Sequence, residues 1–514
     1  MANNSDSIGF YAAAVLQRTV ERHPQKTAII TKEETLTFAA LNERVCALAA
    51  HLYQEGIRQG DRVGILLPNC AAIPLSYFAT QKIGAVTVIL DARLKGMELR
   101  GVLHNADLKL LIVHNQLYAE VEKAQLGGPI LQMWVVNGEG NQSFESKFET
   151  LSDAPNPPSL SPEDDGLVLY TSGTTGDPKG VVLNYINLAQ FPPATAEAWK
   201  TDSQSIWGCI LPMSHIVGPI LCNEIVDKGS TLVIIDQFNP IALLEAIKAH
   251  RITIFPGVPA LFQLLLAVPK LKDYDTRSLR VAGMMGMTVP PPLLRAFKAA
   301  QAHIKVVQGY GLTETSPLIT AVPLEAADAR MGSIGRAVQG IEIRIVNEQG
   351  QEVPTGEPGE IITRGPHVMK GYFRRPEATA ERIRDGWLYT GDIGQVDEDG
   401  YYYHLGRRDD LIITGGLNVY PAEVENAIYG FAGVQEAIVF AMEDKKRGQV
   451  LGAAVVPRPG AAIAEKELLS FLRANLANFK VPQKIAIRRS LPRTSSGKTI
   501  REAAVLLADD AGAS

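Results

Sequence analysis

The residues best suited to chemistry lie in one short segment, Tyr170-Thr-Ser-Gly-Thr-Thr-Gly-Asp-Pro-Lys-Gly180, directly after the apolar run Gly-Leu-Val-Leu. Glycines leave the backbone flexible, and the segment offers hydroxyls, backbone N–H groups and the Lys179 ammonium to the oxygens of a phosphate. A Walker A loop is excluded, because Pro178 stands where that motif needs a glycine before its lysine. An ordinary solvent loop is the alternative, but such loops carry fewer consecutive hydroxyls. The segment therefore predicts an anion-binding loop.

A second Gly-Lys-Thr sequence lies near the end of the chain, in Pro492-Arg-Thr-Ser-Ser-Gly-Lys498-Thr499. The first Walker glycine would stand at residue 492, which is proline, and no sheet backed by a helix is expected to follow. A nucleotide-binding P-loop is therefore excluded here as well. Taken alone, Lys498 could be an exposed surface lysine.

Seven motifs spread over nearly the whole chain resemble those of the adenylate-forming superfamily. This superfamily contains acyl-CoA synthetases, luciferases and the adenylation domains of non-ribosomal peptide synthetases. The motifs, as they stand here, are YTSGTTGDPKG (170–180), LPMSHIVG (211–218), QGYGLTETSP (308–317), GSIGR (332–336), WLYTGDIG (387–394), GRRDDLIITGGLNVYPAEVE (406–425) and PRTSSGK (492–498). One such motif would be weak evidence, whereas seven in the family's order and spacing leave little room for chance.

The resemblance implies a reaction in two halves. A carboxylate attacks the α-phosphate of ATP to give an acyl-adenylate and pyrophosphate, and a thiol then displaces AMP. Two anions must meet in the first half, so the site must neutralise phosphate charge, for which Mg²⁺ and lysine are suited. ATP, Mg²⁺ and coenzyme A are the cofactors and co-substrates that this reaction implies.

The resemblance also assigns residues to the nucleotide. Glu314 would hold Mg²⁺, because a carboxylate suits a hard cation that prefers oxygen ligands; without its context it would be a surface acid paired with a base. Tyr310 would lie against adenine, and Asp392 would accept hydrogen bonds from the ribose hydroxyls. Lys498, Thr313 and Glu314 are the expected catalytic residues. The full set of expected ATP and AMP ligands is Thr171, Ser172, Gly173, Thr174, Thr175, Lys179, Gly309, Tyr310, Gly311, Thr313, Asp392, Arg407 and Lys498.

An acyl pocket is expected from the same resemblance. His215 is given a gating and packing role without proton transfer, because a lone histidine on an apolar segment is more often a core residue than a catalyst. Met284, Met285 and Met287 stand where relatives carry a small Gly-Ala-Pro segment, and thioethers suit an apolar tail. No arginine lies within 283–287 or 308–318 to bind a second carboxylate. The expected pocket residues are His215, Gly283, Met284, Met285, Gly309 and Pro317.

The second half of the reaction is expected to need a moving domain. Asp409 occupies the family's hinge position, and Gly415 and Gly416 would reach the thiol of coenzyme A after the carboxy-terminal domain rotates. A static linker is the alternative reading of this segment. Lys445 is the expected contact to a phosphate of coenzyme A, although charge runs such as 445–447 are more often solvated faces.

Apolar runs alternate with helical patterns from residue 61 onward, which predicts α/β layering in two related sheets. Asn239 and Pro240 predict the start of a helix whose apolar stripe contains Ile241, Leu244 and Ile247. The expected strands are 61–68, 85–90, 108–113, 231–236, 252–256, 279–283 and 304–311.

Further along, alternating strands with Gly and Pro turns predict a β-rich subdomain at about 332–405. The last segment predicts a small α+β domain, with strands at 437–442, 452–457 and 484–489 and a helix at 465–477. The expected domains are therefore residues 1–408, for ATP and the acyl group, and residues 409–514, which move.

Composition limits the partners. The 514 residues include 50 Lys plus Arg and 55 Asp plus Glu, a net charge of −5, which lacks the positive field that non-specific nucleic-acid binding needs. The four cysteines form no CxxC pair, and no uncharged stretch approaches the length of a membrane span, so a cytoplasmic protein is expected. Two further expected partners are a second copy of the chain, in a homodimer, and a lysine acetyltransferase acting on Lys498.

These observations favour an AMP-forming acyl-CoA ligase for a fatty or aromatic carboxylic acid. An adenylating enzyme that loads the phosphopantetheine thiol of a carrier protein is the first alternative, and oxygen, as in luciferases, is another acceptor. A binding protein that keeps the fold without catalysis is the alternative from another class.

Overall fold

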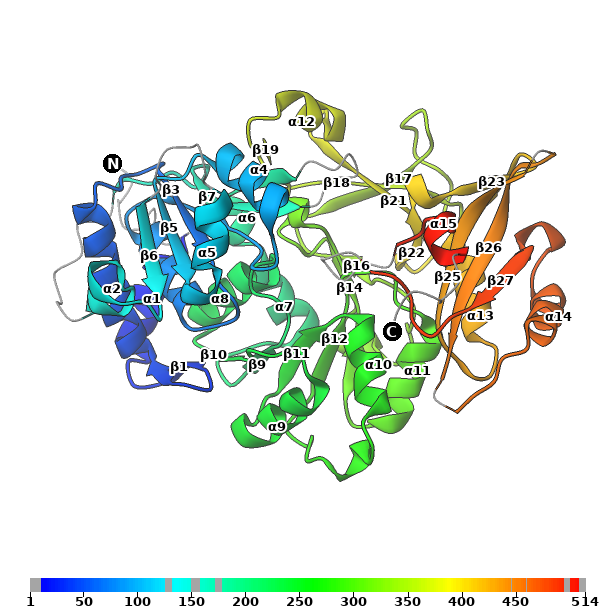
Figure 1. The fold of residues 1–514 in the computed structure, drawn as a ribbon, viewed down its shortest axis with the longest axis horizontal. Coiled ribbons are helices and arrows are strands. Elements are labelled where there is room, and N and C mark those ends of the chain that lie inside the picture. The colour runs from blue at the N-terminus through cyan, green and yellow to red at the C-terminus, as the bar shows by residue number, and fades with distance from the viewer. Residues whose placement is uncertain are drawn as a thin grey trace.

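Two seven-stranded sheets form the large N-terminal part of the computed structural model (Figure 1). The structure describes residues 11–124, 132–148, 158–171, 178–444, 446–458, 460–493 and 500–507. In the first sheet all neighbours are parallel except the last pair. Its strands, in spatial order, are β13 (Lys305–Val307), β12 (Val281–Met284), β11 (Ile254–Gly257), β9 (Ile206–Cys209), β10 (Thr231–Ile234), β1 (Thr27–Ile30) and β2 (Thr35–Thr37).

The second sheet has a parallel body and an antiparallel edge. The antiparallel pair β7–β8 flanks the segment in which the anion-binding loop was predicted, and β19 adds a further strand to β8. The strands, in spatial order, are β19 (Gly371–Tyr372), β8 (Lys179–Asn184), β7 (Asp165–Thr171), β4 (Val86–Ile89), β3 (Arg62–Leu66), β5 (Leu110–His114) and β6 (Gln132–Val136).

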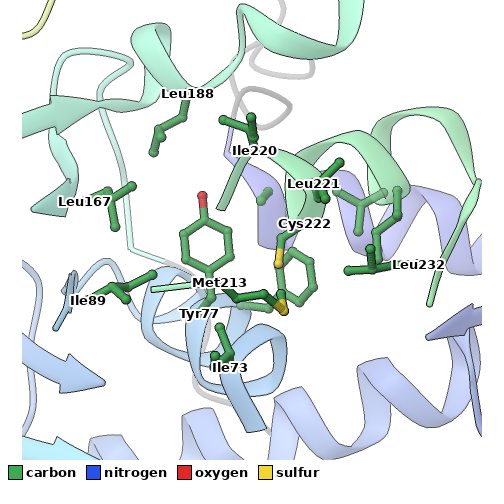
Figure 2. Packing of buried hydrophobic residues seen from close by; sticks show 14 of the residues in the cluster. Ile73, Tyr77, Ile89, Leu167, Leu188, Met213, Ile220, Leu221, Cys222 and Leu232 are labelled. Carbon is green, nitrogen blue, oxygen red and sulfur yellow. The ribbon is translucent and has the colours of Figure 1, made fainter. Parts of the chain in front are cut away.

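Two helices are buried between these sheets, α3 (Ala72–Lys82) and α8 (Val217–Lys228). Every residue of α3 is buried, as expected for a helix that is covered on all sides. Figure 2 shows Tyr77 of α3 and Cys222 of α8 among side chains of both sheets, such as Leu167 and Leu232. Tyr77 Oη donates a hydrogen bond of 3.0 Å to Asn223, so its hydroxyl is satisfied inside the core.

The remaining helices of this part pack either on the two central helices or on the opposite, outer faces of the two sheets. None of the helices in the described ranges is both long enough and apolar enough to span a bilayer. These remaining helices of the N-terminal part are α1 (Ala12–Arg22), α2 (Phe38–Gln54), α4 (Gly96–Ala106), α5 (Asn115–Ala124), α6 (Tyr185–Leu188), α7 (Phe191–Trp199), α9 (Pro240–His250), α10 (Pro259–Ala267) and α11 (Pro291–Ala300).

Two smaller sheets connect the large sheets to the C-terminal part (Figure 1). The first contains β14 (Gly309–Tyr310), β15 (Thr320–Ala321) and β16 (Arg336–Ala337). The second contains β17 (Glu342–Val346), β18 (Gly359–Arg364), β21 (Trp387–Val396), β20 (Ile383–Arg384) and β22 (Tyr402–Arg407), while the helix α12 (Pro376–Arg382) leads into β20.

The small C-terminal part is a further sheet with helices on both faces. On one face α13 (Pro421–Tyr429) and α14 (Glu465–Asn475) pack on an apolar core, and on the other face Leu506 of α15 (Ala503–Leu507) does the same. Its strands are β24 (Leu417–Val419), β23 (Ile412–Thr414), β26 (Gly448–Pro457), β25 (Val434–Asp444) and β27 (Lys484–Ile487).

The predicted fold class is confirmed: a large N-terminal part of layered α/β sheets with a β-rich region precedes a small α+β part. Two details were wrong. The run 304–311 is not one strand, because it breaks at Gln308 into β13 and β14, which belong to different sheets. Ile241 is 42% exposed and does not belong to the buried stripe of α9, which contains Leu243, Leu244 and Ile247. The exact boundary at residue 409 stays a prediction.

Candidate active site

An irregular stretch of β21 presents the best-defined group of polar side chains. Between Tyr389 and Ile393 the pairing with β18 shifts register, and Gly391 has a φ of +74°, which favours glycine. The backbone N–H of Gly391 donates to Glu360 Oε1 at 2.8 Å. The N–H of Asp392 donates to Thr390 Oγ1 at 3.0 Å. The bulge is therefore held by hydrogen bonds on both sides, and it fixes the direction of Asp392.

Asp392 is the centre of this group, with a side chain that is only 4% exposed. Tyr310 Oη donates to its Oδ2 at 2.6 Å, and Arg407 Nη1 lies 3.0 Å from its Oδ1. Burial alone would raise the pKa of Asp392, but His404, Arg407 and Tyr310 together hold it below its usual value. The site therefore contains a buried carboxylate that is ionised at neutral pH.

Tyr310 is fixed by the same contacts. Its ring centroid lies 5.7 Å from that of His404, and burial followed by the Asp392 charge raises the pKa of its hydroxyl well above the usual value. The following turn is tight, because a Cβ on Gly311 would lie 1.1 Å from the carbonyl oxygen of Pro317. Only glycine fits this position. Packing alone therefore requires Gly311, whether or not it also contacts a nucleotide.

Tyr372 links Glu314 to the strand that follows the predicted anion-binding loop. Tyr372 Oη donates to Glu314 Oε1 at 2.9 Å, and Lys179 Nζ lies 5.5 Å from the centroid of the Tyr372 ring. Thr313 and Glu314 belong to a 3₁₀ turn, Thr313–Thr315, and both are partly exposed. One carboxylate beside a lysine fits Mg²⁺, which is usually held by one or two carboxylates together with substrate phosphates.

The base of the predicted loop is closed. Thr171 pairs with Lys179 across the β7–β8 ladder, and Thr171 Oγ1 donates to the Lys179 carbonyl at 3.4 Å. Several predicted residues lie outside the described residues: Ser172, Gly173, Thr174, Thr175, Lys445 and Lys498.

The predicted acyl-pocket residues divide between the two faces of β12. A Cβ on Gly283 would lie 2.7 Å from Met285 Cε, so these two residues share one face. Met284 points to the opposite face, where it is fully buried in a core with Phe255 and Phe262. The prediction that Met284 lines the acyl pocket was therefore wrong, because side chains alternate along a strand.

Another part of the predicted pocket lies around β14. A Cβ on Gly309 would lie 3.5 Å from the Trp199 ring, which places Trp199 beside Gly309. Pro317 is half-buried and follows the turn of Thr313 and Glu314. Trp199, at the end of α7, is a residue that the sequence analysis did not single out.

His215 lies beside an arginine that sequence reasoning missed. Arg93 Nη2 is 2.9 Å from His215 Nε2, and Arg93 also pairs with Asp91 at 2.6 Å. Asp91 Oδ2 lies 3.7 Å from His215 Nε2. The His215 side chain is 43% exposed, so it lies at the surface of the site and not in the core.

The predicted hinge and thiol-facing residues lie at the start of the C-terminal part. Asp409 belongs to a short turn, Arg408–Asp410, and its side chain is 66% exposed. Gly415 and Gly416 have φ angles of 58° and 81° at the tip of the β23–β24 hairpin, with open space around them.

The structure thus brings Tyr310 and Arg407 into contact with Asp392, and it places Glu314 and Lys179 against the same tyrosine, Tyr372. Their roles toward a nucleotide stay predictions. The sequence analysis missed Thr390 and His404, which contact Asp392, and Tyr372, which contacts Glu314. It also missed Arg93, which contacts His215. One signal in the sequence could have pointed to His404. Gly406 lies two residues after it in the same strand, and a glycine inside a strand often marks a bulge.

Comparisons with known proteins cover nearly the whole chain. The AMP-binding enzyme family matches residues 16–373, and the AMP-binding enzyme C-terminal domain matches residues 423–498. A feruloyl-CoA synthase of Amycolatopsis sp. is 37% identical over 94% of this chain and 96% of its own. A long-chain-fatty-acid–CoA ligase of Bacillus subtilis is 33% identical over 95% of this chain and 93% of its own. The crystal structure of the anthranilate CoA ligase AuaEII with anthranoyl-AMP superimposes with a TM-score of 0.90 at 26% identity, over 95% of each chain.

Proposed function

The chain belongs to the family of AMP-binding enzymes, and from this premise we propose that it is an acid–thiol ligase, an AMP-forming acyl-CoA synthetase. It activates a carboxylic acid with ATP to an acyl-adenylate and transfers the acyl group to coenzyme A with release of AMP. The observation that carries this proposal is the contact of Tyr310 and Arg407 with the buried carboxylate of Asp392. Three of the seven motifs meet at that carboxylate.

For the first half-reaction we propose that Asp392 binds the ribose hydroxyls and that the ring of Tyr310 lies against adenine. Thr313 contacts the α-phosphate, and Glu314 holds Mg²⁺, which when bound neutralises phosphate charge. Arg407 keeps Asp392 ionised and offers donors to the ribose or phosphate. Lys498 supplies the last positive charge to the carboxylate and α-phosphate oxygens.

For the second half-reaction we propose that the part from Asp409 onward rotates. Its exposed side chain and the short turn around it leave room for a change in backbone angles. Rotation withdraws Lys498 and brings Gly415 and Gly416 to the thiol, with Lys445 at a phosphate of coenzyme A. The division into residues 1–408 and 409–514 is part of this proposal.

The acid that we propose has an apolar tail, fatty or aromatic. Gly283 and Met285 present a small and an apolar surface on the same face of β12. The arginine beside His215 is already paired with Asp91, so its charge is compensated within the chain. The names of two relatives mention an aromatic and a long-chain fatty acid, which agrees with this choice.

Loading of a carrier-protein thiol is the alternative that uses the same adenylate. A panel of short, long and aromatic carboxylic acids, incubated with ATP, Mg²⁺ and coenzyme A, distinguishes the two. We expect AMP release and a coenzyme A thioester with at least one acid, and loss of both in the Lys498→Ala variant. Acid-dependent pyrophosphate exchange without any coenzyme A thioester would refute the ligase proposal and leave the carrier-protein alternative.

We also propose a compartment, a regulatory modification and an oligomeric state for the protein. The four cysteines are free thiols, which fits a reducing compartment such as the cytoplasm. Acetylation of Lys498 by a lysine acetyltransferase would remove its charge and stop adenylation. An acetylated protein with full adenylation activity would refute that regulation. A homodimer is the oligomeric state proposed, and light scattering of the purified chain tests it.

A further inference from the structure

Arg382, the last residue of α12, lies against the bulge that carries Asp392. Its Nη1 donates to the carbonyl oxygen of Tyr389 at 3.1 Å. A Cβ on Gly391 would lie 2.8 Å from this nitrogen and 3.7 Å from Cζ and Nη2. The absence of a side chain at Gly391 therefore lets the guanidinium lie directly against the turn of the chain.

The other neighbour of Arg382 is Tyr372. Burial raises the pKa of the Tyr372 hydroxyl, as does the charge of Glu314, while Arg382 lowers it through its charge and a hydrogen bond. Tyr372 Oη itself donates to Glu314 Oε1 at 2.9 Å, and Lys179 lies over the Tyr372 ring. Arg382 and Lys179 are thus two cations on the same tyrosine, which is bonded to the carboxylate proposed for Mg²⁺.

The position of Tyr372 follows from two elements of the fold. In β19, Tyr372 pairs with Val181 of β8, the strand that begins at Lys179. Its backbone N–H donates to Thr379 of α12 at 2.8 Å, which joins the helix to the strand. Figure 1 shows α12 next to β19, above the strands β18 and β21. The helix that ends in Arg382 is therefore attached to the same edge of the sheet as the predicted anion-binding loop.

The charge of Arg382 is left without a carboxylate in the described parts of the chain. Two other arginines of this region differ: Arg374 pairs with Asp107 at 2.6 Å and Arg364 with Glu342 at 2.8 Å. Arg382 is half-buried, and among the described residues its guanidinium donates to the Tyr389 carbonyl, with the Tyr372 phenol beside it. A guanidinium in this situation is suited to an anionic ligand, because its planar fork matches two oxygens of one phosphate.

We propose that Arg382 binds the β- and γ-phosphates of ATP and the pyrophosphate that adenylation releases. In this proposal Asp392 lies at the nucleoside end of the site, and Glu314, Tyr372 and Lys179 lie at its phosphate end. Arg382 contacts the bulge that carries Asp392 and also lies beside Tyr372, so it lies between the two ends. This assignment rests on the proposed function, since it assumes that ATP binds between these groups. It adds a cation that none of the seven motifs predicts.

The test compares two arginines of the same segment by titration calorimetry with ATP in the presence of Mg²⁺, with pyrophosphate and with AMP. Arg384, two residues further on in β20, is exposed and lies over the Tyr389 ring at 4.5 Å, so Arg384→Gln is the matched control. We expect Arg382→Gln to weaken ATP and pyrophosphate roughly ten- to a hundredfold, the range of one charge-assisted hydrogen bond, and AMP less than about twofold. Arg384→Gln is expected to change each affinity less than about twofold.

A loss of AMP affinity as large as the loss for ATP would overturn the proposal, because AMP has no β- or γ-phosphate. Unchanged ATP affinity in Arg382→Gln, or equal effects in both variants, would overturn it too. Arg382→Lys keeps the positive charge but loses the planar fork, so it is expected to fold. We expect it to weaken ATP and pyrophosphate more than AMP, but by less than Arg382→Gln does. An equal loss of affinity for all three ligands in this variant would contradict the assignment. Absence of ATP binding to the wild-type protein would instead refute the proposed function itself.

Discussion

Glu224 of α8 is a buried acid that the proposed mechanism does not use, and its titration gives a quantitative prediction. Its side chain is fully buried, Thr195 Oγ1 donates to its Oε2 at 2.9 Å, and its Oε1 has no partner among the described residues. Burial raises the pKa of Glu224 from 4.5 to about 7, although hydrogen bonds from Thr201 and Thr195 act against this. Near neutral pH the folded protein therefore keeps a proton that the unfolded chain has lost.

The sign of the effect follows from this difference in bound protons. Below pH 4.5 the carboxyl is protonated in both states and has no influence. As the pH rises, ionisation of the unfolded chain lowers the free energy of unfolding, until the folded carboxyl ionises as well near pH 7. Because burial raises the pKa of Glu224 from 4.5 to about 7, the ionised carboxylate destabilises the folded protein by about 3 kcal/mol above pH 8 and by about 1 kcal/mol at pH 5.5.

The variant Glu224→Gln removes the charge and keeps a group that can accept from Thr195. We expect its thermal midpoint to exceed that of the wild type by an amount that grows between pH 5.5 and pH 8.5, to on the order of 3 °C. Differential scanning calorimetry of both proteins across this range measures the difference, in which the other titrating groups cancel. Glu197→Gln, at an exposed position of α7, is the control and is expected to show no such trend. A constant difference across pH, or a less stable Glu224→Gln protein at pH 8.5, would refute the reasoning.

Three further outcomes follow from the site. Asp392→Asn removes the charge that Tyr310 and the neighbouring guanidinium contact, so AMP affinity measured by calorimetry is expected to fall roughly ten- to a hundredfold; wild-type affinity would contradict the ribose role. Arg501→Met leaves the buried Glu425 carboxylate, 2.6 Å away, without its partner, and is expected to cost about 2 kcal/mol in chemical denaturation, part of which Glu425→Gln restores in the double variant. Asp409→Pro fixes one backbone angle at the hinge, so either pyrophosphate exchange or thioester formation is expected to be lost, and a variant with both intact would remove the hinge assignment.

Much of the large α/β part could be predicted because its strands are uninterrupted apolar runs. The predicted strands 61–68 and 231–236 contain β3 and β10, in which nearly every residue is buried, as in a parallel sheet covered on both faces. The run 304–311 has the same apolar start, but its strand breaks at Gln308, because the next two residues, β14, pair with β15 in another sheet. That pairing depends on where the chain returns several residues later, which a local pattern does not contain.

The site could be predicted only where one motif already contains the functional residue. Asp392 and Tyr310 stand inside motifs, and the structure brings their side chains to a 2.6 Å hydrogen bond. Tyr372 could not be found, because it reaches Glu314 from 58 residues further along the chain, after β19 has paired with β8. Met284 was misplaced for another reason, since residue type alone does not tell which face of a strand meets the ligand.

The contacts of Asp392 also explain how a buried carboxylate can serve a ligand without first being rearranged. A carboxylate offers about four acceptor positions; Tyr310 uses one on Oδ2, while Arg407 and His404 both lie against Oδ1. Oδ2 therefore keeps a position for the ribose hydroxyl that we propose it binds, while His404, Arg407 and Tyr310 maintain the ionised form against the cost of burial. Because the bulge and its hydrogen bond to Glu360 fix the backbone, the orientation of the carboxylate is set in the protein alone, so the proposed binding of ribose would not bear the cost of ordering it.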